Sequence, residues 1–161
     1  MARDGKVAQI EKWSHDQGVN YMVAKDADES ETSTTPQDQA GLSIAVHDGD
    51  YYQFDFTLLI RSSDAADGPK VSLTFPSVTT FGARVQMQNA TTDTVGAITA
   101  SGGTVSVPSV LANNTTYVCR IAGAIAPSAD GTLQVQVGSV NGTGTITTKE
   151  GSFGVINEID P

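Results

Sequence analysis

The chain has 161 residues, of which 39% are apolar and 17% are charged, and its formal net charge is −9. A chain of this length is expected to form one domain that buries roughly 70% of its unfolded surface, so it can fill a hydrophobic core. The excess of carboxylates repels phosphates and anionic lipids. This argues against nucleic-acid binding and against docking on a membrane.

The chain contains a single cysteine, Cys119. One cysteine excludes an internal disulfide and a multi-cysteine metal site, and its context TYVCRI predicts a small buried side chain. The first residues, MARDGKVAQIEKW, lack the apolar core of a secretory leader, and no window is long and apolar enough to span a bilayer. We therefore expect a soluble protein made in a cytoplasm.

The first 39 residues divide into two segments. Residues 1–24 contain short alternating stretches, GKVAQIEKW and GVNYMVAK, which predict either an extended N-terminal arm or two edge strands. Residues 25–39, KDADESETSTTPQDQ, are acidic and almost free of apolar side chains, so we predict a solvated loop. The globular domain is expected to occupy residues 40–161.

From residue 40 onward the sequence alternates between strands and turns. In YYQFDFTLLIR, residues 51–61, the even positions are apolar, which is the period of a strand with one buried face. Shorter strands are predicted at VSLTF, ARVQMQN, TVGAITA, TYVCRIAGAI, TLQVQVGSV and GSFGVINEID. With no helical pattern, the sequence predicts an all-β fold: a single antiparallel β-sandwich of jelly-roll or Greek-key type with a short N-terminal arm.

One sequence pattern occurs twice in this domain. A polar turn, residues 47–50 or 113–116, precedes a strand led by tyrosine, and Ala-Asp-Gly follows at residues 66–68 and 129–131. Asp-Gly suits a chain reversal because glycine tolerates positive φ and aspartate can hydrogen-bond the nearby backbone. Two similar hairpin units are typical of a double Greek key, so we interpret the repeat as architecture and not as chemistry.

The sequence offers little catalytic chemistry. It contains no G-x-S-x-G, H-E-x-x-H, P-loop or Cys-x-x-Cys motif, and both histidines, His15 and His47, fall in turns where surface exposure is expected. Asp26, Asp28 and Glu29 resemble part of a calcium loop, but the glycine and glutamate that an EF-hand-type loop needs further on are missing. We expect no enzymatic activity, no cofactor and no metal.

Carbohydrate binding stays open as an alternative. Asp55 is predicted to point outward from its strand, without the second carboxylate that glycoside hydrolysis requires. Trp13 and Tyr51 are the candidate aromatic side chains that could stack on a sugar ring.

Two long stretches, LSIAVHDGDYYQFDFTLLIRSSDAADGPKVSLTFPS and GTLQVQVGSVNGTGTITTKEGSFGVI, resemble small β-sandwich virion proteins of tailed bacteriophages. That family has a turn-Tyr-x-Phe strand before an Ala-rich turn and a strand ending in Phe-Pro. Its C-terminal part runs from Gly-Thr-Leu-x-Leu-x through a Thr-rich strand to Gly-Ser and a last strand. The resemblance covers roughly residues 40–158 and departs from the family at Gly138, where a tryptophan-like residue is usual.

The resemblance implies a head decoration (cement) protein or a fibre tip, generally trimeric. Because only a short segment precedes the predicted sandwich, we favour a decoration protein that binds the major capsid protein as a homotrimer. It would lie on the virion exterior, after assembly in the host cytoplasm, without contacting nucleic acid or membrane. The alternative is a tail-fibre or receptor-binding tip that recognises a host surface glycan. Apolar residues of the N-terminal segment are predicted to contact the capsid or a neighbouring subunit: Val7, Ile10, Trp13, Tyr21 and Met22.

Overall fold

The computed structural model of the chain describes residues 20–88, 93–107 and 112–159. These residues form strands and turns, and none of them belongs to a helix that could cross a bilayer. The strands are β1 (Asn20–Ala24), β2 (Glu29–Glu31), β3 (Gln37–Val46), β4 (Tyr51–Ser62), β5 (Pro69–Thr74), β6 (Val78–Gln88), β7 (Asp93–Ile98), β8 (Thr104–Ser106), β9 (Thr116–Pro127), β10 (Gly131–Ser139), β11 (Ile146–Thr148) and β12 (Phe153–Ile159).

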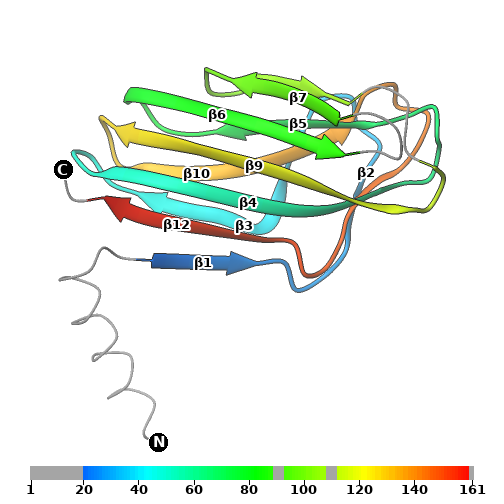
Figure 1. Ribbon diagram of the computed structural model, residues 1–161, viewed down its shortest axis with the longest axis horizontal. Helices are drawn as coiled ribbons and strands as arrows, with labels where there is room; N and C mark the ends of the chain where they lie inside the picture. The colour runs from blue at the N-terminus through cyan, green and yellow to red at the C-terminus, as the bar shows by residue number, and fades with distance from the viewer. Residues whose placement is uncertain (1–19, 89–92, 108–111, 160–161) are drawn as a thin grey trace, which may run out of the picture.

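The strands form two antiparallel sheets. The large sheet has the order β1-β12-β4-β9-β6-β7, with β11 pairing both β4 and β2, and the small sheet has the order β3-β10-β5-β8. Figure 1 looks onto the large sheet, with β1 at the bottom and β7 at the top. Without the β6–β7 hairpin, the two main layers are β1-β12-β4-β9 and β3-β10-β5-β8, which is a jelly-roll arrangement. The predicted fold class is confirmed, and the β6–β7 hairpin widens the large sheet beyond β9.

The alternating pattern of β4 supplies the centre of the core. Its even residues are at most 2% exposed: Tyr52, Phe54, Phe56, Leu58 and Ile60. From the small sheet, Leu133, Val135 and Val137 of β10 are fully buried. The period-2 predictions for both strands are therefore confirmed. Cys119 is buried as well, as predicted.

The repeated sequence pattern corresponds to two pairs of consecutive strands, each of which crosses from the large sheet to the small sheet. β4 and β9, the tyrosine-led strands, pair antiparallel in the large sheet. β5 and β10, the strands after Ala-Asp-Gly, pair antiparallel in the small sheet. Each unit thus places one strand at the centre of each layer, which confirms that the repeat is architectural.

The two Ala-Asp-Gly turns differ in the burial of their aspartate. Asp130 is exposed and accepts a hydrogen bond from the backbone N–H of Asp48 (2.9 Å). Asp67 is fully buried against the loop between β10 and β11. Its donors are the Ser139 hydroxyl (2.6 Å) and the backbone N–H groups of Asn141 (3.0 Å), Thr143 (2.9 Å) and Gly144 (2.7 Å). Burial raises the pKa of Asp67, but these hydrogen bonds outweigh it, so the pKa lies below its usual value and the carboxylate orders the loop.

Two glycines make room for phenylalanine rings of β4. Gly123 of β9 lies opposite Phe54, and Gly154 of β12 lies opposite Phe56. A Cβ atom at Gly123 would stand 2.3 Å from the carbonyl oxygen of Gly82 and 2.7 Å from the Phe54 ring. At Gly154 it would stand 2.3 Å from the Phe56 ring. The inner face of the large sheet therefore has no space for a methyl group at either position.

The N-terminal boundary of the sandwich differs in part from the prediction. β1 pairs with β12 along its whole length, which confirms the edge-strand alternative for residues 20–24, and the sandwich therefore begins before residue 40. Residues 25–39 were predicted as a solvated loop, but they include β2, which pairs with β11, and the start of β3. The composition does not indicate this ordered structure, because polar contacts and not buried apolar side chains hold the segment in position.

Candidate interaction surface

One face of the large sheet carries most of the exposed apolar bulk. Every second residue of its strands points away from the small sheet, and these residues form the surface that we call the outer face. Seven large apolar side chains of the described residues are exposed. Six of them belong to the outer face: Met22, Tyr51, Val95, Val118, Phe153 and Ile159. Because six of the seven lie on this one face, we take the outer face as the candidate interaction surface.

The outer face has two unlike halves. The half over β1, β12 and β4 carries the large apolar side chains Met22, Phe153, Val155, Ile159 and Tyr51. The half over β9, β6 and β7 carries larger outward residues at one end, among them Val118, Arg120 and Val95. At its other end small outward residues surround Arg84: Gly82, Ala97, Ala122 and Ala124. A Cβ atom at Gly82 would meet nothing within 4 Å, so the surface is open at this position.

A shallow groove of about 410 Å³ lies between the halves. It is lined by Asp55, Thr57, Arg120, Phe153 and Val155. Arg120 donates from Nε to Asp55 Oδ2 at 2.7 Å and from a second guanidinium nitrogen to the same oxygen, and this pairing raises the pKa of Arg120. Because the pair is partly solvated it adds little stability. Fixed charges beside apolar side chains can instead orient a bound partner.

The charge of the outer face differs from that of the whole chain. All three arginines of the described residues, Arg61, Arg84 and Arg120, stand at its outward positions. The outward acidic residues there are Asp55 and Asp93. The other twelve acidic residues of the described part lie elsewhere, accompanied by three lysines. On a chain with a net charge of −9, the outer face is therefore slightly positive.

The predicted contact residues fall into two groups. Val7, Ile10 and Trp13 lie outside the described residues. Met22 is 73% exposed, and its register partner is Val155 of the groove, so Met22 continues the outer face. Tyr21 pairs with the buried Ile156 and is therefore turned toward the opposite side of β1.

The outer face has no clear signal in the sequence. The odd positions of residues 51–61 mix tyrosine, leucine, aspartate and arginine, which is compatible with an ordinary solvated strand face. One signal was present in Leu59, the apolar exception to the alternation. Its partner across the sheet is the exposed Val118.

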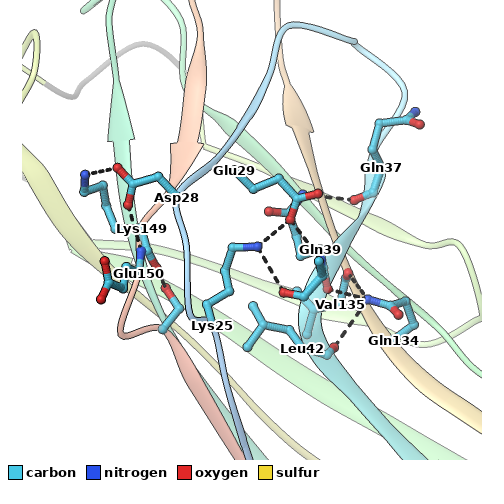
Figure 2. Close-up of polar contacts among 12 residues, drawn as sticks. Lys25, Asp28, Glu29, Gln37, Gln39, Leu42, Gln134, Val135, Lys149 and Glu150 are labelled. Atoms are coloured by element: carbon cyan, nitrogen blue, oxygen red, sulfur yellow. Dashed lines mark hydrogen bonds and ion pairs between the residues drawn. The ribbon is translucent and has the colours of Figure 1, made fainter.

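A buried lysine joins the acidic segment to the sandwich. Lys25 is 4% exposed, and its ammonium group contacts the Glu29 carboxylate and donates to the carbonyl oxygen of Ala40 at 3.0 Å. The same Glu29 oxygen accepts a hydrogen bond from the backbone N–H of Ala40 (2.9 Å). Figure 2 shows Lys25 reaching from the β1–β2 connection toward these partners. A buried charge needs such partners, so this contact fixes the course of the segment.

Gln134 of β10 compensates for a bulge in β3. The pairing register shifts between Gln134 and Gln136, and Gly41 adopts a φ of 76° in the bulged strand. The Gln134 side-chain amide donates to the carbonyl oxygens of Gln39 (3.0 Å) and Val135 (2.8 Å), as Figure 2 shows. The side chain thus satisfies backbone groups that the irregular ladder leaves unpaired.

The acidic residues considered as calcium ligands bind different lysines. Asp28 contacts the Lys149 ammonium group and accepts from the backbone N–H of Glu150 (2.9 Å), whereas Glu29 turns to Lys25. The hydrogen bond from Lys149 is the main cause of a lowered Asp28 pKa. Within the part of the chain that the structure describes, no three His, Cys, Asp or Glu side chains gather closely enough to hold a metal ion.

One of the two histidines lies among the residues that the structure describes. His15 lies outside the described residues, and His47 is exposed in the turn before β4, as predicted. His47 Nδ1 lies 3.6 Å from Asp130 Oδ1. The Tyr52 hydroxyl donates to the Asp50 carboxylate (2.9 Å) and accepts from the backbone N–H of His47 (3.2 Å). These contacts stabilise the turn.

The solved structures similar to this chain are distant from it. No protein-family model and no curated protein matches the sequence. The Eiger TNF structure from S. frugiperda covers 89% of this chain and 93% of its own, with 10% identity and a TM-score of 0.48. A structure of infectious bursal disease virus, Gt strain, covers 89% and 38%, with 12% identity and a TM-score of 0.24. The VP2 subviral particle of that virus covers 89% and 40%, with 10% identity and a TM-score of 0.24. Similarity at this level transfers no function.

Proposed function

We propose that the chain is a virion structural protein that decorates the head of a tailed bacteriophage. In this proposal a homotrimer binds the major capsid protein on the capsid exterior and acts without catalysis or cofactor. The observation that carries the proposal is the outer face, a broad sheet surface with exposed apolar bulk on an otherwise acidic sandwich. The resemblance of residues 40–158 to β-sandwich virion proteins supplies the phage context.

The proposed action is mechanical. A ligand that binds the assembled shell and not its separated subunits stabilises the shell by mass action, by about 2.7 kcal/mol per site at a concentration of 100 times Kd. Each bound trimer that contacts several capsid subunits would add this free energy to the stability of the shell. The acidic surface away from the outer face would keep neighbouring virions apart.

Head binding is tested by mixing the purified protein with undecorated phage heads and sedimenting the heads. We expect saturable co-sedimentation and a rise in the temperature at which the heads release DNA. Heads that sediment without the protein at micromolar concentration would contradict the decoration function.

The N-terminal residues are tested by deleting residues 2–13. Among the residues that the structure describes, the buried core cluster lies between Leu42 and Ile156, so we expect the shortened chain to fold. A folded chain that no longer binds heads would support docking through Val7, Ile10 and Trp13. An unfolded chain would refute that docking role and make the segment part of the fold.

A fibre-tip function is favoured by one observation, the groove on the outer face. An exposed aromatic ring, Phe153, stands there beside the Asp55–Arg120 pair, and such groups bind and orient sugars. Screening the protein against a glycan array tests this function. Glycan binding that is lost in Phe153→Ala, without binding to heads, would favour the fibre tip over the decoration protein.

A further inference from the structure

We propose that the groove on the outer face binds a neutral sugar ring, which stacks on Phe153 and places two adjacent hydroxyl groups on the Asp55–Arg120 pair. A sugar site here rests on the fibre-tip candidate of the proposed function and deepens it, since it names the chemistry of the ligand and the part that each residue plays. Shape, charge and free hydrogen-bonding groups each support a sugar as the occupant.

The groove has the width of a single ring. β12, β4 and β9 lie side by side in the large sheet (Figure 1). Phe153, Thr57 and Arg120 stand in one row across these strands, and all three line the groove. The two outer strands of the row are about 9.6 Å apart, twice the usual spacing of about 4.8 Å. A ring that contacts a side chain on each face needs about 7–8 Å, which is two carbon contacts of about 3.5–4.0 Å. The short threonine between the two long side chains leaves this space open.

Phe153 offers an uncovered aromatic face for the ring. It is 39% exposed, and its neighbours across the sheet, Ala24 of β1 and Thr57 of β4, have short side chains. Val155, two residues further along β12, extends the same apolar wall. The C–H face of a sugar ring is apolar, so packing it on an aromatic ring removes both surfaces from water.

The polar wall of the groove consists of a neutralised pair of charges. Asp55 Oδ2 accepts hydrogen bonds from Nε of Arg120 at 2.7 Å and from a second guanidinium nitrogen. A simple anion gains little here, because the attraction of Arg120 is offset by the repulsion of Asp55, and the reverse holds for a cation. The net charge of −9 disfavours an anionic ligand further. The groove therefore suits a neutral ligand.

The same pair has hydrogen-bonding groups left for a ligand. A guanidinium carries more N–H groups than the two that Arg120 donates to Asp55. No residue that the structure describes donates to the other carboxylate oxygen, Asp55 Oδ1. The side chains of Arg120 and Asp55 are 63% and 33% exposed, so a ligand can reach both.

Adjacent hydroxyl groups of a sugar match these free groups. Each hydroxyl can both donate and accept. One hydroxyl can therefore donate to Asp55 Oδ1 while its neighbour accepts from Arg120, and such charge-assisted hydrogen bonds are stronger than neutral ones. An apolar side chain of a partner protein would fill the wall at Phe153 but would leave both polar groups unused.

Saturation-transfer NMR with three neutral probes tests the site: methyl glucopyranoside, methyl mannopyranoside and methyl galactopyranoside. All three carry adjacent hydroxyl groups on one ring, and they differ in the directions of those groups. A ligand of this size is expected to bind with a Kd on the order of 1 mM, which is within the range of the method. We expect transfer to at least one of the three probes.

Three variants locate the binding in the groove. Phe153→Ala removes the stacking face, and Asp55→Asn removes the charged acceptor but keeps its shape. Tyr51→Ala, at an exposed aromatic residue of the outer face that does not line the groove, is the matched control. We expect the first two variants to weaken binding by at least about tenfold and the control to leave it unchanged. If circular dichroism shows that Phe153→Ala is unfolded, Asp55→Asn still tests the site, because a partly solvated ion pair adds little stability.

The outcomes separate the sugar site from the decoration function, which sedimentation with undecorated heads tests independently. No transfer to any probe well above the expected Kd, or equal binding by wild type and both groove variants, would overturn the site. A chain that binds heads and no sugar overturns the site and leaves the decoration protein intact. A chain that binds sugar and no heads supports the site and contradicts the decoration function. If both bind, release of the heads by a saturating sugar supports the site and places the capsid contact on the outer face.

Discussion

The two Ala-Asp-Gly turns provide a matched pair of substitutions. The same three residues occur at 66–68 and 129–131, but Asp67 is buried and Asp130 is exposed. We predict that Asp67→Ala strongly destabilises the sandwich and that Asp130→Ala does not, although both remove the same chemical group from the same local sequence.

The magnitude follows from the donors that Asp67 satisfies. Its removal leaves the buried Ser139 hydroxyl and the buried backbone N–H of Gly144 without acceptors, each at a cost of about 1–3 kcal/mol. Asn141 and Thr143 are exposed and can turn to water. We therefore expect Asp67→Ala to lower the free energy of unfolding by about 4 kcal/mol, a large part of the roughly 5–15 kcal/mol of a typical domain. Asp130→Ala should change it by less than about 0.5 kcal/mol.

Urea unfolding at a fixed protein concentration measures both variants, since the proposed self-association would make the midpoint depend on concentration. Equal losses for the two variants would refute the assignment of Asp67 as the anchor of the β10–β11 loop. The pH dependence gives a second readout. Because the pKa of Asp67 is lowered on folding, its contribution is present above the unfolded value of about 3.9 and is lost as the pH falls through the folded value. The difference between wild type and Asp67→Ala should therefore shrink in acid.

Three further predictions concern the core and the buried lysine. Gly123→Ala should lower the free energy of unfolding by at least about 2 kcal/mol, because its Cβ would meet a backbone oxygen at 2.3 Å. Gly82→Ala, which has open space around its Cβ position, should change the free energy of unfolding by less than about 0.5 kcal/mol. Urea unfolding measures both, and similar losses for the two variants would count against the close packing of Gly123 on Phe54. Burial raises the pKa of Cys119 to about 12, so a thiol reagent should modify it only after unfolding, and fast labelling of the native protein would disprove its burial. Glu29→Gln should lower the free energy of unfolding by about 3 kcal/mol, because it leaves the buried Lys25 without its carboxylate partner. Adding Lys25→Met to this variant should recover most of the loss. A double variant as unstable in urea as Glu29→Gln alone would contradict the pairing.

The fold could be predicted because its longest strands alternate between apolar and polar residues with few exceptions. Period-2 patterns in residues 51–61 and in β10 identify the buried faces directly, and the repeated turns mark the crossings between sheets. Strand order could not be predicted, because β4 pairs with β9 and β12 through contacts distant in sequence. The segment of residues 25–39 was misjudged for a different reason, since its order depends on the buried Lys25 and not on apolar residues.

The candidate surface could be predicted less well than the fold. Met22 was identified from the apolar content of the N-terminal segment, but its position beside Val155 depends on the pairing of β1 with β12. The gathering of Arg61, Arg84 and Arg120 on one face has no local sequence signal, because the three residues come from three strands that only the sheet brings together. Asp67 and Asp130 show the same limit, since identical local sequences lie in different tertiary surroundings.

The solution mass of the wild-type chain tests the central claim most directly. Light scattering over a dilution series should give the mass of three chains at high concentration, with dissociation on dilution. A mass of one chain at every concentration would contradict the trimeric virion protein that we propose.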